Sequence, residues 1–114
     1  MEMHVEDLKN GVIVVTLRGR LDITGASAID LKFNAAAGST RSIVVDMSAV
    51  DFLASLGIRV LVMGAKSVKN KGGKLVLLSP QDDVKLVLTS AGIDDIIPIM
   101  SDRADAIAAA QKFS

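Results

Sequence analysis

The chain has 114 residues, enough for one compact domain, and half of them are hydrophobic, so a core can form without metals or disulfides. Cysteine is absent, which excludes disulfide bonds, thiol catalysis and cysteine-based zinc sites. Thirteen basic residues balance thirteen acidic ones and only three residues are aromatic, so the composition offers neither a basic footprint nor a stacking platform for nucleic acid.

The N-terminal part of the chain is expected to form a β-hairpin. Met1, Met3 and Val5 alternate with polar residues, which is the pattern of a half-buried strand. The turn signal Asn10-Gly11 follows this strand. Residues 12–17 are then apolar on both faces, which indicates a strand inside a sheet that is covered on both sides.

The next segment predicts a helix and a strand. Thr24 can cap a helix that runs to about Ala37. A short apolar run at residues 43–45 is typical of a buried strand, and this strand is expected to close at residues 46–48.

A loop over residues 51–57 is expected to lead into a second helix of roughly 13 residues. Its predicted buried stripe consists of Ile58, Leu61, Val62, Ala65 and Val68. Its predicted solvent-facing stripe consists of Arg59, Met63, Lys66 and Asn70. The four lysines at positions 66, 69, 71 and 74 are interpreted as a solvated helix end and loop.

The C-terminal part continues the alternation of strands and helices. The expected elements are a strand at 74–78, a helix between Pro80 and Ala91-Gly92, an edge strand at 96–99 and a terminal helix at 104–112. The order β-β-α-β-α-β-α-β-α predicts a single-domain α/β fold with an N-terminal β-hairpin, about four helices and a mixed, mostly parallel sheet.

The chain shows no targeting or membrane signal. Residues 1–7 are acidic where a signal peptide would be basic, and no apolar run approaches the roughly 20 residues that span a bilayer. We therefore expect a cytoplasmic protein without membrane insertion.

The residues do not form a catalytic constellation. His4 is the only histidine and falls on the polar face of the first strand, so neither a triad nor a histidine metal cluster is supported. Asp22, Asp46 and Asp51 could gather at the ends of the second and third strands and bind a divalent cation, although caps and turns are simpler roles for them. We expect no enzyme, no metal and no cofactor.

Ser55 stands at the start of the second helix, where two roles are open. Serine is a favoured N-cap, because its oxygen accepts a backbone N–H that would otherwise lack a partner. The other role is regulatory, since a phosphate here would add about −1.5 to −2 charges beside a helix N-terminus, whose dipole tolerates anions. If a partner had to desolvate this charge, the complex would lose about 2–5 kcal/mol of binding free energy, which is a roughly 30- to several-thousand-fold loss of affinity.

Five segments in series carry a family resemblance. They are Gly19-Arg20-Leu21-Asp22 after the second strand, Ile43-Val44-Val45-Asp46-Met47-Ser48, residues 50–58 around Ser55, residues 72–77, and residues 88–97 with Ala91-Gly92-Ile93. In this order they resemble the STAS family, the fold of bacterial anti-sigma-factor antagonists. The resemblance covers essentially the whole chain, so residues 1–114 are identified as one STAS domain.

The resemblance implies a partner-switching role. Unphosphorylated antagonists of this family bind an anti-sigma factor that is also a serine kinase, and so free a sigma factor. The kinase phosphorylates the antagonist and releases it, and a metal-dependent serine phosphatase restores it. By position, Ser55 corresponds to the phosphorylated serine, Gly57 to the small residue after it and Asp22 to the acid in the neighbouring loop.

The resemblance also outlines a partner-facing surface. Its further members are Thr24, Ala54, Leu56, Arg59, Met63 and Lys66. The chain departs from the family's usual Asp-Ser-Ser/Thr-Gly at Ala54 and Leu56. Two other hypotheses are a constitutive STAS binding module in a transporter-associated or signalling complex, and a nucleotide binder that uses the region of Asp22 and Ser55.

Overall fold

The structure is a computed structural model that describes residues 1–113. Its elements are β1 (Glu2–Asp7), β2 (Val12–Leu21), α1 (Ile23–Ser39), β3 (Ser42–Leu53), α2 (Ser55–Lys69), β4 (Leu75–Leu78), α3 (Asp82–Ser90), the 3-10 helix η1 (Ile93–Asp95), β5 (Ile99–Met100) and α4 (Arg103–Ala110). Among these residues, no helix is both long enough and apolar enough to cross a bilayer.

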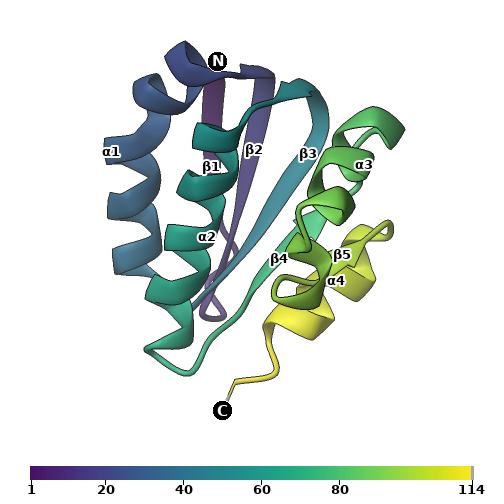
Figure 1. The fold of residues 1–114 in the computed structure, drawn as a ribbon. Helices are drawn as coiled ribbons and strands as arrows, with labels where there is room; N and C mark the ends of the chain where they lie inside the picture. The colour runs from purple at the N-terminus through teal and green to yellow at the C-terminus, as the bar shows by residue number, and fades with distance from the viewer. Residues whose placement is uncertain (114) are drawn as a thin grey trace.

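One five-stranded sheet organises the molecule. The strands lie side by side in chain order, with β1 antiparallel to β2 and the remaining neighbours parallel. Helices α1, α2 and α3 cover one face of the sheet, and α4 covers the other (Figure 1). The predicted α/β class, the N-terminal hairpin and the mostly parallel sheet are confirmed.

Strand β2 shows why the sheet has two hydrophobic cores. Ile13, Val15 and Leu17 face the larger core beneath α1, α2 and α3. Val12 and Val14 face the smaller core beneath α4. Because every one of these side chains is buried, the expectation that residues 12–17 are covered on both faces is confirmed.

Strand β3 is longer than the sequence predicts, because its pairing with β2 contains two irregularities. The register shifts between Thr16 and Arg18 and again between Gly19 and Arg20. The 10 residues of β2 therefore run beside 12 residues of β3. Such bulges interrupt the two-residue alternation that identifies a strand in a sequence. The predicted loop over residues 51–57 is wrong, since β3 continues to Leu53 and α2 begins two residues later.

The two edge strands also differ from the prediction. Residues 96–99 do not form the expected strand, because the N–H groups of Ile96 and Ile97 donate back to the carbonyl of Ile93 at 3.0 and 2.8 Å. Only Ile99 and Met100 pair with β4, after the 3-10 helix η1. At the other edge β1 is largely exposed. Met3 is half-buried but Val5 is exposed, so the predicted half-buried face of this strand is only partly present.

The two ends of the described chain lie at opposite ends of β2 (Figure 1). A Cβ placed on Gly19 would lie 3.5 Å from the Cα of Met1, so the first residue sits near the end of β2. The ring of Phe113 lies beside Gly11, just before β2 starts, and the guanidinium carbon of Arg41 is 4.4 Å from the centre of that ring.

Candidate protein-binding switch site

The parallel strands β2 and β3 end side by side and bring the starts of two helices together. Leu21 pairs with Leu53, and the N–H of Ala54 donates to the carbonyl of Leu21 at 3.0 Å. Asp22 follows Leu21 and Ser55 follows Ala54, so both residues lie at the same end of the sheet, where α1 and α2 begin (Figure 1).

Asp22 is the N-cap of α1. Its Oδ1 accepts the N–H of Gly25 at 2.8 Å, and the Nε of Arg20 lies 3.5 Å from its Oδ2. The Gly25 hydrogen bond, assisted by Arg20, lowers the pKa of Asp22 below its usual value, so the carboxylate is ionised at neutral pH. The prediction that Thr24 caps this helix is wrong, because Thr24 lies inside the first turn, where its side chain is exposed.

Arg20 joins Asp22 to an aromatic side chain that the sequence analysis missed. Arg20 and Phe52 pair across β2 and β3, and the guanidinium carbon lies 4.3 Å from the centre of the Phe52 ring. Phe52 remains 41% exposed, so this cation–π contact forms part of the surface. Sequence alternation could not pair these residues, because a register shift lies between Gly19 and Arg20.

Ser55 is the first residue of α2 and is exposed. The N-cap position is taken by Ala54, whose methyl group cannot accept a hydrogen bond, so the interpretation of Ser55 as the cap is wrong. The first intrahelical bond runs from the N–H of Ile58 to the carbonyl of Ala54 at 3.1 Å. The N–H groups of the preceding three residues therefore have no acceptor within the helix and leave its positive end open beside the Ser55 hydroxyl.

Gly57 sets how closely α2 approaches β2. A Cβ at this position would lie 2.7 Å from the Cγ of Leu21 and 2.8 Å from its carbonyl oxygen. Any larger residue would push the start of the helix away from the sheet. Gly57 is buried, so it positions Ser55 and offers no side chain to a partner, whereas Leu56 is half-buried.

The exposed stripe predicted on the second helix is confirmed for Arg59, Met63 and Lys66, whereas Asn70 is exposed but lies just beyond α2 as its C-cap. Ser55, Arg59, Met63 and Lys66 follow the spacing i, i+4, i+8 and i+11, which places them on one side of α2. All four are exposed, and Met63 is 48% exposed although it is apolar. We define the switch surface as Asp22, Thr24, Ala54, Ser55, Leu56, Arg59, Met63 and Lys66.

The three carboxylates considered for a cation do not come together. Asp46 lies within β3, opposite Thr16. The prediction that this strand ends at residues 46–48 is wrong, since it continues for seven residues beyond Asp46. Its Oδ1 accepts the N–H and the hydroxyl of Ser48 at 3.0 and 2.8 Å. Across residues 1–113, no group of three or more histidine, aspartate or glutamate residues is placed to hold a metal ion.

Comparisons with known proteins identify the family of the chain. The model of the STAS domain family matches residues 6–106. BtrV of Bordetella bronchiseptica, a candidate anti-sigma factor antagonist, is 28% identical over 104 residues, which cover 90% of each chain.

Two solved structures resemble the whole fold. An anti-sigma factor antagonist from Mycobacterium paratuberculosis has a TM-score of 0.85 and 27% identity over 96% of this chain and 93% of that one. The phosphorylated form of SpoIIAA from Bacillus has a TM-score of 0.72 and 20% identity over 94% and 97%, and at that identity it supports the fold alone. The chain belongs to the STAS domain family, and relatives that it matches over nine tenths of their length include anti-sigma factor antagonists.

Proposed function

We propose that this chain is an anti-sigma factor antagonist, which binds an anti-sigma factor through the switch surface and thereby frees a sigma factor. In this proposal the protein works in the cytoplasm by binding and not by catalysis. The observation that carries the proposal is Ser55, an exposed hydroxyl that caps nothing and begins a continuous exposed stripe. The full-length similarity to anti-sigma factor antagonists supports it.

Phosphorylation of Ser55 is the proposed off-switch, and the geometry of α2 supports this. Arg59 lies one turn after Ser55, and an anion placed four residues before a cation on a helix is the more favourable order. The open N–H groups of the first turn would also favour the anion. The phosphorylated chain would therefore keep its fold while Arg59 becomes less available to the partner.

The proposed partners follow the family's cycle. The anti-sigma factor is a serine kinase that phosphorylates Ser55, and a metal-dependent serine phosphatase removes the phosphate. That SpoIIAA, which shares this fold, has a phosphorylated form supports the proposal.

Intact mass after incubation with the cognate kinase and magnesium ATP tests the acceptor. We expect one added phosphate on the wild-type chain and on Ser27→Ala, whose serine is also exposed but lies in α1. We expect none on Ser55→Ala. Equal labelling of Ser55→Ala would exclude Ser55 as the acceptor. A wild-type chain that binds tightly but gains no phosphate would instead identify a constitutive binding module.

Binding affinities test the electrostatic mechanism. Ser55→Asp should weaken the complex with the anti-sigma factor, because the partner must desolvate a charge, and phosphorylation should weaken it roughly 30- to several-thousand-fold. The asparagine of Ser55→Asn is nearly the same size as aspartate but carries no charge, so this variant should bind the anti-sigma factor much more tightly than Ser55→Asp. Ser55→Ala should bind and resist release by ATP. Equal affinities for the aspartate, asparagine and wild-type forms would contradict the mechanism.

A further inference from the structure

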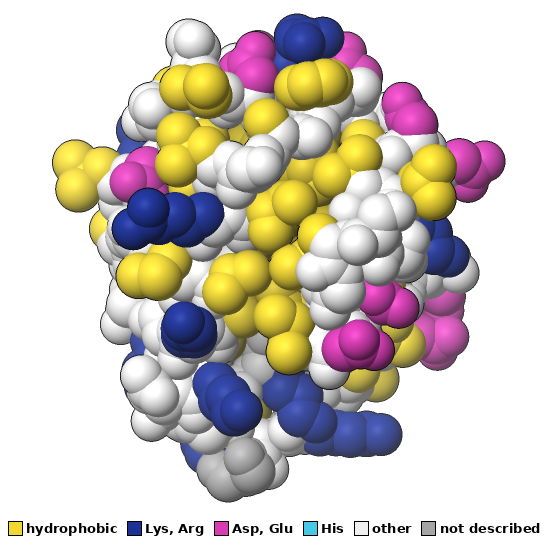
Figure 2. Space-filling view, in the orientation of Figure 1, with side chains coloured by type: hydrophobic (Ala, Val, Ile, Leu, Met, Phe, Trp, Pro, Cys, Tyr) yellow, Lys and Arg dark blue, Asp and Glu magenta, His cyan; other side chains and the backbone are white. Residues whose placement is uncertain are grey.

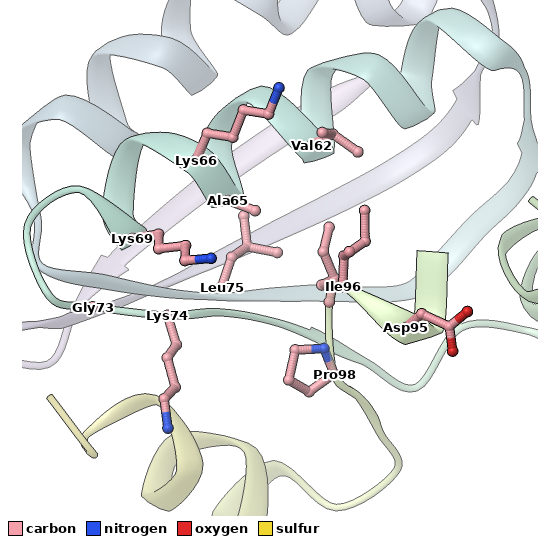
Figure 3. A pocket seen from close by; sticks show the side chains of 11 residues that line it. Val62, Ala65, Lys66, Lys69, Gly73, Lys74, Leu75, Asp95, Ile96 and Pro98 are labelled. Carbon is pink, nitrogen blue, oxygen red and sulfur yellow. The ribbon is translucent and has the colours of Figure 1, made fainter. Parts of the chain in front are cut away.

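A pocket of about 520 Å³ lies at the end of α2 that is remote from Ser55. It is bounded by the C-terminal half of α2, the start of β4 and the segment from Asp95 to Pro98 (Figure 3). This volume falls within the range of roughly 300–1,000 Å³ that is usual for sites that bind small ligands.

The floor of the pocket is apolar. Leu75 and Ile97 are buried beneath it, and Val62 and Ala65 line it from α2. Ile96 stands at the rim and is 66% exposed. Figure 2 shows a band of hydrophobic side chains that runs between α2 and α3 on this face, with lysine and arginine side chains gathered at its lower end. An apolar group in the pocket would remove this surface from water.

The charged lining of the pocket is mainly positive. Lys66, Lys69 and Lys74 line it, against the single carboxylate of Asp95. In Figure 3 the side chain of Lys69 lies across the pocket with its nitrogen toward Leu75, while Lys66 and Lys74 point outward in opposite directions. Within residues 1–113, the ammonium groups of these three lysines make neither an ion pair nor a hydrogen bond.

Lys71 differs from the other lysines of the predicted solvated cluster. Its Nζ donates to the carbonyl of Ala37 and holds the end of α1 against the turn after α2. Lys71 is exposed, as the interpretation of a solvated helix end and loop expects, but unlike the other three it also has a structural partner. The other three remain available to an anion.

The C-terminus of a helix repels anions, but the turn after α2 reduces this effect. The carbonyls of Lys66 and Lys69 accept the N–H groups of Asn70 and Gly72 at 3.1 and 3.0 Å. The carbonyl of Val68 accepts those of Lys71 and Gly73 at 3.0 and 2.9 Å. Because the turn satisfies the carbonyls of Lys66, Val68 and Lys69, the end of α2 opposes the charge of the ammonium groups less than an open helix end would.

We propose that this pocket binds a small amphipathic anion, that is, a monomeric carboxylate or phosphate that carries an apolar chain. The chain lies on the floor formed by Leu75 and Ile97, and the headgroup pairs with Lys69. One inward-pointing ammonium group above a short apolar floor suits a single headgroup better than an extended acidic segment of a protein. Lys69 lies 14 positions after Ser55, or about 21 Å along the helix, so an occupied pocket leaves the start of the switch surface free.

Titration of the isotope-labelled chain with monomeric decanoate, followed by amide NMR shifts, tests the proposal. We expect shifts at Val62, Ala65, Lys69 and Leu75, and none at Ser55. Octanoate should bind more weakly, by about fourfold for each methylene removed. Decanol and decyltrimethylammonium should bind more weakly than decanoate. Lys69→Ala should weaken decanoate about two- to fivefold, and the matched variant Lys32→Ala on α1 should not change it.

Several results would overturn this inference. Decanol that binds as tightly as decanoate, or Lys69→Glu with unchanged affinity, would remove the role of charge. Shifts confined to other residues, or no shift at all, would exclude the pocket as the site. Binding only to phosphatidylglycerol vesicles, or only to an acidic leucine-containing peptide, would assign this face to a membrane or to a protein instead. The kinase labelling of Ser55 does not enter this test, so the two proposals fail independently.

Discussion

At the scale of single residues, Ala54 is an unusual choice for the start of α2. Its backbone has the extended conformation of an N-cap, with φ −107° and ψ 170°, but its side chain cannot accept a hydrogen bond. The family's usual sequence has an aspartate here, and aspartate is among the best N-cap residues. The chain therefore lacks a side-chain cap directly beside the proposed phosphorylation site.

Restoring a cap should stabilise the protein. We expect Ala54→Asp and Ala54→Asn each to raise the free energy of unfolding by about 0.5–2 kcal/mol, because either side chain can accept an N–H of the first turn. Urea denaturation of the three proteins measures this. Two variants no more stable than the wild type would show that the N–H groups at the start of α2 already have acceptors in solution.

Asp22 should make stability depend on pH. Its pKa in the folded chain lies below the usual value of 3.8, so its ionised form stabilises the fold. This contribution is fully present above pH 3.8 and is lost as the pH falls through the lower pKa of the folded state. Asp22→Asn keeps an acceptor for the N–H of Gly25 but cannot ionise. We expect the wild type to be more stable than this variant at neutral pH, and the difference to shrink below pH 3.8 in urea denaturation. A difference that is constant with pH would contradict the assignment.

At the scale of elements, the contact between α1 and α2 depends on Gly64. A Cβ there would lie 2.4 Å from the Cε2 of Phe33, which is fully buried and cannot move aside freely. We expect Gly64→Ala to destabilise the fold by up to about 2 kcal/mol, because overpacking outweighs the better helix propensity of alanine.

Gly38 provides a matched control for this prediction. It lies on α1 with nothing within 4 Å of a Cβ, so Gly38→Ala should stabilise by up to about 1 kcal/mol. Thermal or urea denaturation measures both variants. A stabilised Gly64→Ala would mean that the two helices separate more easily than their packing indicates.

The elements also show where prediction from sequence works and where it stops. Periodicity located the buried strand at residues 43–45 and the stripe of α2 that carries Arg59. In both elements the spacing of apolar and polar residues follows directly from which side chains are buried. The true end of β3 was missed, since a bulge depends on the partner strand as much as on the strand itself.

The same limit applies to the candidate site. Family resemblance pointed to Ser55 and Asp22, but the Arg20–Phe52 pair needs the register of two strands. The lysine-lined pocket needs α2 and the segment around Pro98 to meet, and these lie far apart in the sequence. Contacts of this kind arise only when the chain folds.

At the scale of the whole molecule, the two faces of the sheet differ in the size of their cores. The face beneath α1, α2 and α3 buries a large cluster that includes Phe33 and Met47. The face beneath α4 is covered by a helix of 8 residues whose buried side chains are Ala106 and Ala110. A helix held by so little apolar surface should open locally far more often than the central strands.

Hydrogen exchange measures this difference. We expect the amides of α4 to exchange well before those of β2 and β3, whose opening requires global unfolding. The amides of α2 provide an internal comparison, because that helix buries Val60, Leu61 and Val68 in the larger core. Equal protection of α4 and β3 would show that the molecule unfolds only as one cooperative unit.

The opposite placement of the two described ends of the chain decides how partner binding should be measured. An affinity tag before Met1 would emerge beside Gly19, close to Asp22, and would crowd the surface that the partner must reach. Phe113 lies beside Gly11, about 26 Å away along β2, so a tether on the C-terminal side starts far from Ser55 and presents it to the solution. Immobilisation through the C-terminal side is therefore the orientation in which a biosensor reports the true affinity.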